Sequence, residues 1–573
     1  MSKNEGAYTL AKEKFSNSKF DEALKSIQNV KKKDYDFYLF RSKINYEIND
    51  FYSSLQDAKE CIKHKEKEIE PHQISSKCYL NMYDYDNANK ELEISKKISH
   101  SSEENKKIEN MIQKKLKENE ENCKKYPQYK AFINYMKVIY NGGIYINKIH
   151  VKWESDWMRC ILSSENIKEN ETLIRVPDDL LITLDGAQNS EIGKYFDESL
   201  KKKLNSPHHC LLTAYLLQEQ KKGKDSKWAF YFPFLPSSYS SFPIFYTDEE
   251  MKLLEGTQFY NIVVDKKKEI RQDYDWICEK YEEFKQFSYE EFCKFREVVS
   301  SRIFGVTMKG KKNDIIAPYA DLFNHRRPRT THWAYEDDQN AFVVSSIEDM
   351  GPEMEVFDSY GRKCNARFLL NYGFTIEDNE DDEIKIVLTL DNNDPLYKDK
   401  VKVLGSSKKF TLVKNCREEQ SLLFFSWIRL MEYKDNIKGV KHNAPINIDN
   451  EISMLTKVKK IMEKEISNYQ RSLSDEEDLL KKNRNNMNFN EFNCCIMRIG
   501  EMRIFQYYID LCTKCIDLFN KKNKVEIEKA LSTKSQNLNL FNFIFKKSLK
   551  KKHLLWFIHI FFCHSHFNRC FKE

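Results

Sequence analysis

Two polar clusters near the middle of the chain constrain its fold more than any other feature. The first is IIAPYADLFNHRRP, in which Asp321, Asn324 and His325 follow a short apolar run. The second is FDSYGRKCNARFLLNYGF, which holds Tyr360–Gly361 and Tyr372–Gly373–Phe374. Taken singly, each has an ordinary explanation, since Asn and Asp often cap helices and a Tyr–Gly pair often makes a turn. The two clusters lie about 35 residues apart in the chain.

The patterns around these clusters predict an α+β core flanked by helical domains. Short β-type runs occupy residues 144–151, 158–162, 173–176 and 180–183, and a mostly helical stretch follows to Val299. Strand patterns return from Ile315 to Phe374 and again at residues 387–390, and the chain after Pro395 is expected to be helical. This order predicts a catalytic domain interrupted by a helical insert and bounded by all-α segments.

The N-terminal segment predicts repeated helical hairpins. Phe20, Phe51 and Tyr85 each begin an amphipathic pattern and lie 31 and 34 residues apart, with a small residue three positions later. This period resembles that of tetratricopeptide repeats, and an ordinary helical bundle is the alternative. Either fold is a scaffold or a groove for a peptide or partner protein. The charged stretch 106–125 has almost no apolar face and marks the expected end of this region.

Composition excludes several classes of function. The net charge of +6 arises from 94 basic and 88 acidic residues that are interspersed, so no nucleic-acid footprint is expected. The fifteen cysteines form no regular disulfide framework or zinc spacing, which predicts a reducing compartment, cytoplasm or nucleus, and no metal site. The apolar run 554–563 is half the length of a membrane span, so none is expected.

The two clusters together resemble the paired motifs of SET-domain methyltransferases. The runs ADLFNH and YGRKCNARFLLNYGF match the subclass related to Rubisco large-subunit methyltransferase, which includes actin-histidine methyltransferases. The similarity extends from about Tyr129 to Leu518. It implies a SET β-fold core with a helical insert and a C-terminal all-α substrate-binding domain. The expected domains are repeats at 1–118, a SET domain at 119–377 with its insert at about 186–300, a substrate-binding domain at 378–545, and a tail of unknown role at 546–573.

The resemblance also implies a cofactor, S-adenosylmethionine, and a role for each site residue. Tyr360 is the expected catalytic residue. Phe304 and Tyr372 are expected to line the channel for the target side chain. The expected cofactor-binding residues are Arg159, Arg302, Asp321, Asn324, His325, Tyr372, Gly373 and Phe374.

The chemistry of methyl transfer agrees with aromatic residues at these positions. Transfer from a sulfonium is an in-line displacement that needs an uncharged amine, and a narrow apolar channel favours the uncharged form of lysine. Histidine-directed relatives have an amide where this chain has Phe304, so the resemblance favours a protein-lysine N-methyltransferase.

Two alternatives stay open from the sequence, a protein-histidine N-methyltransferase and a non-catalytic adaptor that binds other proteins. The adaptor is suggested by one departure from the family pattern. Members usually have a glycine-containing loop that wraps the cofactor, and here its glycine positions are Met158 and Cys160.

Overall fold

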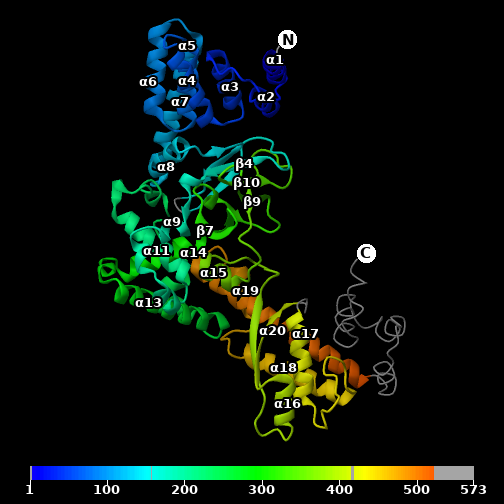
Figure 1. Cartoon of the computed structure of the whole chain (residues 1–573). Coiled ribbons are helices and arrows are strands. Elements are labelled where there is room, and N and C mark those ends of the chain that lie inside the picture. Colours follow the sequence, from blue (N-terminus) through cyan, green and yellow to red (C-terminus); the bar gives the residue numbers. More distant parts are fainter. Residues whose placement is uncertain (1–2, 156–157, 415–418, 522–573) are drawn as a thin grey trace. The chain divides into compact units, whose positions relative to one another are not determined.

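The computed structural model describes residues 3–155, 158–414 and 419–521, and the expected tail at 546–573 lies outside them (Figure 1). The chain forms two compact units. The first contains Met1–Ser238 and Glu269–Gly361, and the second contains Tyr239–Lys268 and the described residues from Arg362 onward. In the described part of the chain, no helix combines the length and hydropathy that a bilayer crossing requires.

The first unit begins with antiparallel helices. These are α1 (Lys3–Ser16), α2 (Phe20–Ile27), α3 (Tyr35–Glu47), α4 (Phe51–His64), α5 (Ile69–Asn81), α6 (Tyr85–Ile98), α7 (Glu103–Lys125) and α8 (Tyr129–Asn141). Helices α2, α4 and α6 start at the three repeated aromatic residues, and the small residues Ala23, Ser54 and Ala88 are fully buried. The region is therefore consistent with helical repeats, and the tetratricopeptide assignment stays a prediction.

Helix α7 differs from its expected character. Ile108 and Ile112, one helical turn apart, are fully buried where α7 packs beside α5 and α6. The expectation that this stretch lacks an apolar face is wrong, because two buried isoleucines suffice when a helix docks along a narrow stripe.

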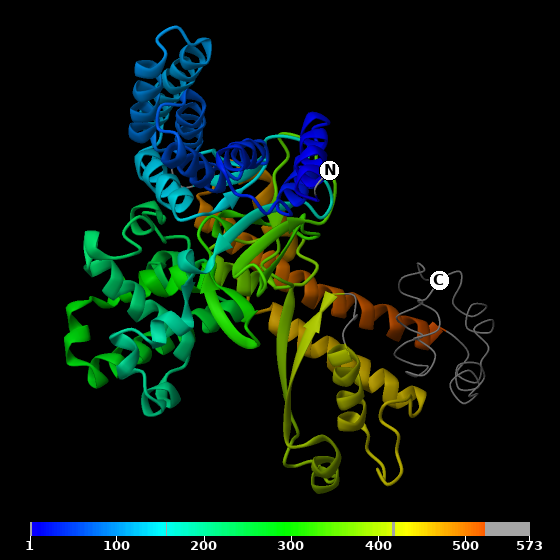
Figure 2. The ribbon, with the colours of Figure 1, turned by 45° about the horizontal axis from the view of Figure 1, so that its top comes forward.

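Strands from distant parts of the sequence form the core of the first unit. One sheet has the order β1-β4-β10-β9, made of β1 (Tyr145–Ile146), β4 (Thr172–Pro177), β10 (Ala341–Ser346) and β9 (Thr331–Glu336). A second sheet has the order β5-β7-β6, made of β5 (Ile182–Thr183), β7 (Lys311–Ile316) and β6 (Phe304–Met308). The remaining pairs are β2 (Ile149–Trp153) with β3 (Arg159–Ser163), and β8 (Asn324–His325) with β11 (Phe357–Asp358). Figure 2 shows the cyan strands beside the green strands. The cyan strands precede the inserted helices in the sequence, and the green strands follow them.

Helices fill most of the insert between these strands. They are α9 (Leu184–Gln188), α10 (Glu198–Lys203), α11 (Pro207–Lys221), α12 (Asp248–Lys252), α13 (Gln258–Lys280) and α14 (Tyr289–Arg302). The stretch Tyr239–Lys268 belongs to the second unit, where Leu254 and Phe259 share a core with Leu369 and Met497.

The second unit continues from Arg362 as a helical domain with one pair of antiparallel strands among its described residues. Its elements are α15 (Asn365–Tyr372), β12 (Glu383–Thr389), α16 (Tyr397–Leu404), β13 (Ser407–Val413), α17 (Glu419–Glu432), α18 (Ile448–Ile466), α19 (Leu473–Asn483) and α20 (Phe489–Lys521). The largest core cluster of this unit joins α17, α18 and α20 to the strands β12 and β13.

Three local expectations are wrong. β13 is a strand where helix was expected, and its Phe410 and Leu412 point into the core while β12 supplies its hydrogen-bond partners. Residues 365–372 form a helix within a stretch expected to be strands. The strand β6 begins at Phe304, ahead of the predicted return of strands at Ile315.

A buried carboxylate fixes the start of α13 within the second unit. Glu501 on α20 accepts hydrogen bonds from the backbone N–H groups of Gln258 (2.9 Å) and Phe259 (3.2 Å), and also from the Tyr469 hydroxyl. These bonds satisfy backbone donors that a helix leaves unpaired at its N-terminus. Burial raises the pKa of Glu501 to about 7, even though the hydrogen bonds oppose this shift.

Replacing Glu501 with glutamine is expected to flatten the pH dependence of stability. The pKa of Glu501 is raised from 4.5 to about 7 on folding. Between these values the folded chain binds more protons, so its free energy of unfolding falls as the pH rises. One pKa unit corresponds to about 1.4 kcal/mol, so between pH 5 and pH 8 the free energy of unfolding of the wild type is expected to fall by up to about 3 kcal/mol more than that of the variant. Urea denaturation at pH 5 and pH 8 measures this difference, with the exposed Glu463→Gln on α18 as control. Equal pH slopes for wild type and Glu501→Gln would contradict it.

Candidate functional site

The parallel pairing of β8 and β11 brings the first polar cluster and the beginning of the second together in the first unit. Phe357 lies opposite Asn324, and Asp358 lies opposite His325. The backbone N–H of Arg326 donates to the Asp358 carbonyl at 2.9 Å and extends the pairing by one residue. Residues more than 30 positions apart in the sequence therefore lie next to each other, as the resemblance to the paired motifs implied.

Tyr360 is held by contacts with the first cluster. Its hydroxyl donates to the carbonyl of Phe323 at 2.7 Å, and its backbone N–H donates to Nδ1 of His325 at 2.9 Å. The imidazole and phenol rings stack with centroids 5.2 Å apart. Because Nδ1 accepts a hydrogen bond, the proton of the neutral imidazole lies on Nε2. The phenol oxygen is thereby fixed beside the residue that precedes Asn324.

Asn324 ties the first cluster to strand β3. Its side-chain N–H groups donate to the backbone carbonyl of Arg159 at 3.1 Å and to the Glu355 carboxylate at 2.8 Å. Both amide donors are used within the protein. The side-chain carbonyl oxygen of Asn324 receives no recorded hydrogen bond from the described residues, so it can accept one from a ligand.

The residues that replace the expected glycines lie at the start of this same strand. Cys160 belongs to β3, and Met158 is the residue immediately before the strand. Extended backbone is open to any residue, so a side chain at Cys160 causes no backbone strain. Burial raises the pKa of the Cys160 thiol to about 11, which keeps it neutral.

Arg302 and Asp321 form a buried ion pair. The Arg302 guanidinium donates to the Asp321 carboxylate at 2.8 Å and to the Asp321 carbonyl at 3.3 Å. The Tyr231 hydroxyl donates to the same carboxylate at 2.6 Å. Side-chain exposure is 13% for Arg302 and 1% for Asp321, so water screens this pair very little. Burial, with the Asp321 charge adding to it, raises the pKa of Tyr231 well above its ordinary value, and this tyrosine stays a donor.

An aromatic wall surrounds Phe304 in the same unit. Its ring packs edge-on against Trp333 at 5.2 Å and contacts Phe342 at 5.0 Å. The Trp333 indole N–H donates to the Asp358 carboxylate at 3.2 Å. Burial raises the pKa of Asp358 to about 6. The wall is therefore apolar at Phe304, and the hydrogen bond from Trp333 to the buried Asp358 holds the indole in place.

The side chain of Arg159 points into an aromatic cluster. Its guanidinium lies 4.2 Å from the centroid of Phe234 and 5.3 Å from that of Trp153, and it donates to the Phe234 carbonyl at 3.4 Å. These contacts are typical of a cation–π interaction that stabilises the fold. The backbone carbonyl of Arg159 accepts from Asn324, and its contact with a cofactor stays a prediction.

The predicted residues Tyr372, Gly373 and Phe374 lie in the second unit, at the end of α15. Gly373 ends the helix with φ of 74°, and a Cβ there would lie 2.6 Å from the Ser241 hydroxyl, so both conformation and space require glycine. Phe374 stacks on Phe368 at 5.2 Å. The aromatic residues around Gly373 form a cluster through contacts within the second unit.

Asn365 is a structural residue of the second unit. Its side chain donates to the Ile376 carbonyl and to Asp382, and it accepts from the Ile376 N–H. The motif asparagine therefore shapes the turn after α15.

Three residues of the first unit that contact the predicted site residues or Trp333 were not predicted from the sequence. Tyr231 lies 90 residues before Asp321 in the insert, and no local pattern links them. Glu355 and Asp358 lie just before Tyr360. The sequence around this short strand does not indicate whether their side chains are buried or which residues they contact. Among the described residues, no group of three or more His, Cys, Asp and Glu side chains is arranged to hold a metal.

Comparisons with known proteins agree with this geometry. The model of the SET domain matches residues 158–361, and that of the Rubisco LSMT substrate-binding domain matches residues 391–505. An actin-histidine N-methyltransferase from Mus musculus is 24% identical over 376 residues, which are 60% of this chain and 62% of the relative. That from Rattus norvegicus is 28% identical over 255 residues, or 42% of each protein. The chain thus spans less than two thirds of the length of these relatives.

Solved structures share the fold. The SET domain of LSMT bound to lysine and AdoHcy superposes with a TM-score of 0.58 at 18% identity, covering 74% of this chain and 99% of that structure. Rubisco LSMT bound to sinefungin and monomethyllysine gives a TM-score of 0.58 at 20% identity, with 76% and 100% covered.

Proposed function

Because the chain joins a SET domain to a Rubisco LSMT substrate-binding domain, we propose that it is an S-adenosylmethionine-dependent protein methyltransferase. The observation that carries the proposal is the pairing of β8 with β11, which fixes the Tyr360 hydroxyl 2.7 Å from the carbonyl next to Asn324. We further propose that the acceptor is a lysine side-chain nitrogen.

The residues of the first unit suit such a cofactor. The Asn324 side-chain oxygen can accept a hydrogen bond from the ammonium of its amino-acid part. The protonated Nε2 of His325 can donate to a nitrogen of its adenine. When bound, the cofactor supplies an electrophilic methyl group on a sulfonium. Arg302 and Asp321, which are joined by their ion pair, are also proposed to bind the cofactor.

The protein's own part in the reaction is to orient and to exclude water. Tyr360 is the proposed catalytic residue, because a fixed phenol oxygen can orient an incoming amine and contact a polarised methyl group. An apolar wall disfavours the charged ammonium of lysine and so favours the form that has a lone pair. Phe304 is the proposed wall for the target in the first unit, and the role of Tyr372 in the target channel stays a prediction from the sequence.

A histidine target is the second candidate, and the curated relatives that modify a histidine of actin favour it. Phe304 favours lysine, since a phenyl ring offers an imidazole no hydrogen bond. Incubating a cell lysate with labelled S-adenosylmethionine and the full chain tests the proposal. Site mapping by mass spectrometry then identifies the modified residue. If no protein is labelled and calorimetry shows no binding of the cofactor, the non-catalytic adaptor is the alternative that remains.

Replacing Phe304 with asparagine is expected to shift the target preference toward histidine. The amide can hydrogen-bond an imidazole, and it removes part of the apolar wall that favours an uncharged lysine. We expect the ratio of histidine to lysine methylation to rise by about tenfold, corresponding to about 1.4 kcal/mol in relative barrier. Quantitative mass spectrometry of a mapped target peptide, with histidine placed at the target position in a second peptide, measures the ratio. An unchanged ratio would remove Phe304 from target selection.

Two further assignments remain proposals. The helices α1–α7 offer a surface for a peptide or partner protein. The twelve described cysteines are free thiols, which agrees with the cytoplasm or nucleus as the compartment.

A further inference from the structure

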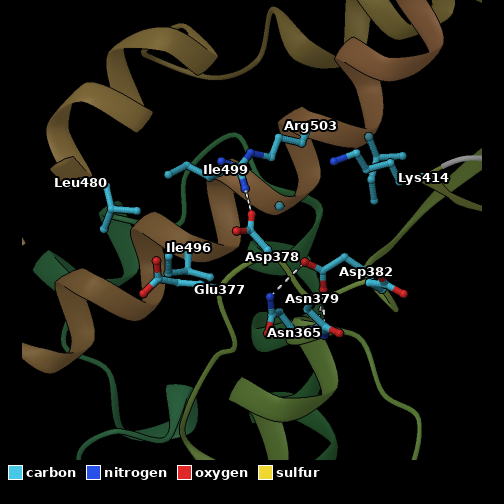
Figure 3. Close-up of a pocket in the computed structure, with 13 residues that line it drawn as sticks. Asn365, Glu377, Asp378, Asn379, Asp382, Lys414, Leu480, Ile496, Ile499 and Arg503 are labelled. Carbon is cyan, nitrogen blue, oxygen red and sulfur yellow. Dashed lines mark hydrogen bonds and ion pairs between the residues drawn. The ribbon is translucent and has the colours of Figure 1, made fainter. Parts of the chain in front are cut away.

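A cavity of about 280 Å³ lies inside the second unit (Figure 3). It is enclosed by the start of α15, the loop between α15 and β12, the end of β13, and helices α19 and α20. Pockets for drug-sized ligands usually have about 300–1,000 Å³, so this one suits a single side chain better than a cofactor. Much of its lining falls within the part matched by the substrate-binding domain.

One side of the cavity is apolar. Leu480 of α19 and Ile496, Ile499 and Ile504 of α20 line it, and the three isoleucines are almost fully buried. Gly500 lies among them in the middle of a 33-residue helix, where glycine costs about 1 kcal/mol relative to alanine. A Cβ at Gly500 would lie 2.6 Å from the Asp382 carboxylate. The glycine therefore keeps the helix close to this acid and leaves the cavity open.

The opposite side is acidic. Glu377, Asp378, Glu380 and Asp382 line it, against two basic residues, Arg503 and Lys414. Glu377 pairs with Arg484, and Asp378 pairs with Arg503. These two acids already have cationic partners within the unit.

Asp382 has no cationic partner among the described residues. Its carboxylate accepts hydrogen bonds from the backbone and side-chain N–H groups of Asn365 at 2.7 and 2.9 Å, and from Asn379 at 3.4 Å. All of these donors are neutral amides. Burial, with the charges of Glu501 and Asp381 adding to it, raises the pKa of Asp382 to about 7. A cation in the cavity would compensate this carboxylate.

The combination of an apolar wall with a carboxylate is suited to a long basic side chain, whose methylene stem packs on the isoleucines while its charged head meets the acid. A metal ion fits poorly, because four isoleucine and leucine side chains supply no ligands and the described residues contain no metal-type cluster. We propose that this cavity receives a lysine or arginine side chain of the protein substrate, other than the residue that is methylated. This inference rests on the proposed function for the identity of its ligand.

Binding of small model cations to the full chain, without S-adenosylmethionine, tests the cavity directly. The probes are N-acetyl-arginine amide and N-acetyl-lysine amide, with the uncharged N-acetyl-citrulline amide for comparison, and ligand-observed NMR gives the dissociation constants. We expect saturable binding of the cationic probes only. Asp382→Asn is expected to weaken it about tenfold, as a lost charge-assisted contact does.

Two further variants complete the experiment. Glu380→Gln, at the exposed rim, is expected to weaken binding of the cationic probes about twofold to threefold, and it decides the test if Asp382→Asn does not fold. Glu463→Gln on α18 removes one negative charge outside the cavity and is expected to leave binding unchanged. Equal binding of the citrulline probe, equal loss in Glu463→Gln, or no saturable binding by the wild type would overturn the proposal.

The outcome is separable from that of the methyl-transfer experiment. Probe binding needs neither cofactor nor transfer, so a chain that binds the cations but labels no protein retains the cavity and loses only the proposed function. Once a methylated substrate is mapped, Asp382→Asn is expected to raise its KM with kcat unchanged, because the contact binds ground state and transition state equally. A fall in kcat alone would contradict a substrate-binding role.

Discussion

Replacing Tyr360 with phenylalanine is expected to lower the rate of methyl transfer by about 10²–10³-fold, the usual loss when one preorganised polar group is removed from a reacting centre. The hydroxyl is fixed by its hydrogen bond to the Phe323 carbonyl, and the ring stays stacked on His325. Phenylalanine keeps that stacking and the backbone hydrogen bond to His325 Nδ1. We therefore expect cofactor affinity, measured by calorimetry, to change by less than about threefold, since a typical neutral hydrogen bond contributes only about 1 kcal/mol net.

A matched control separates the lost hydroxyl from general damage. Tyr335 is a buried tyrosine of the first unit, and its hydroxyl donates to Asp178 at 2.6 Å rather than to a residue of the paired clusters. Tyr335→Phe loses a comparable hydrogen bond and is expected to keep normal transfer. If lysate labelling by Tyr360→Phe equalled that of the wild type, Tyr360 would have no place in the mechanism. If both variants lost activity equally, the effect would be one of stability.

The paired clusters were predictable because their residues are both local in sequence and chemically distinctive. Asn324, His325 and Tyr360 stand out by type and spacing, and the β8–β11 pairing brings them together as expected. Asn365 belongs to the same motif, yet its contacts show a structural role at the turn after α15. A motif therefore identifies the segment, whereas the contacts decide what each member does.

The missed features depend on contacts that no short window contains. Tyr231 reaches Asp321 from the inserted helical region, and its neighbours in sequence are equally aromatic. Strand β13 has three exposed lysine and serine residues before Phe410, and that composition resembles a polar helix. Only the pairing with β12 makes it a strand. Tertiary partners, rather than local preference, determined each of these outcomes.

Replacing Arg302 with methionine is expected to reduce the free energy of unfolding by about 3–5 kcal/mol, because the Asp321 carboxylate would be left buried without its cation. Side-chain exposure of 1% at Asp321 gives water almost no access to that charge. The Tyr231 hydroxyl would remain its one recorded hydrogen-bond partner among the described side chains. Urea denaturation measures the loss, and calorimetry is expected to show that cofactor binding is lost as well.

The double variant Arg302→Met with Asp321→Asn separates stability from function. The neutral amide removes the uncompensated charge and still offers an oxygen to Tyr231, so most of the lost stability is expected to return, as when a buried ion pair is replaced as a unit. Cofactor binding and methyl transfer are expected to stay low, because the cationic group at the site is still missing. A double variant that regains wild-type transfer would show that Arg302 and Asp321 act only by holding the fold. A double variant as unstable as Arg302→Met would show instead that the lost packing of the guanidinium, and not the buried charge, causes the destabilisation.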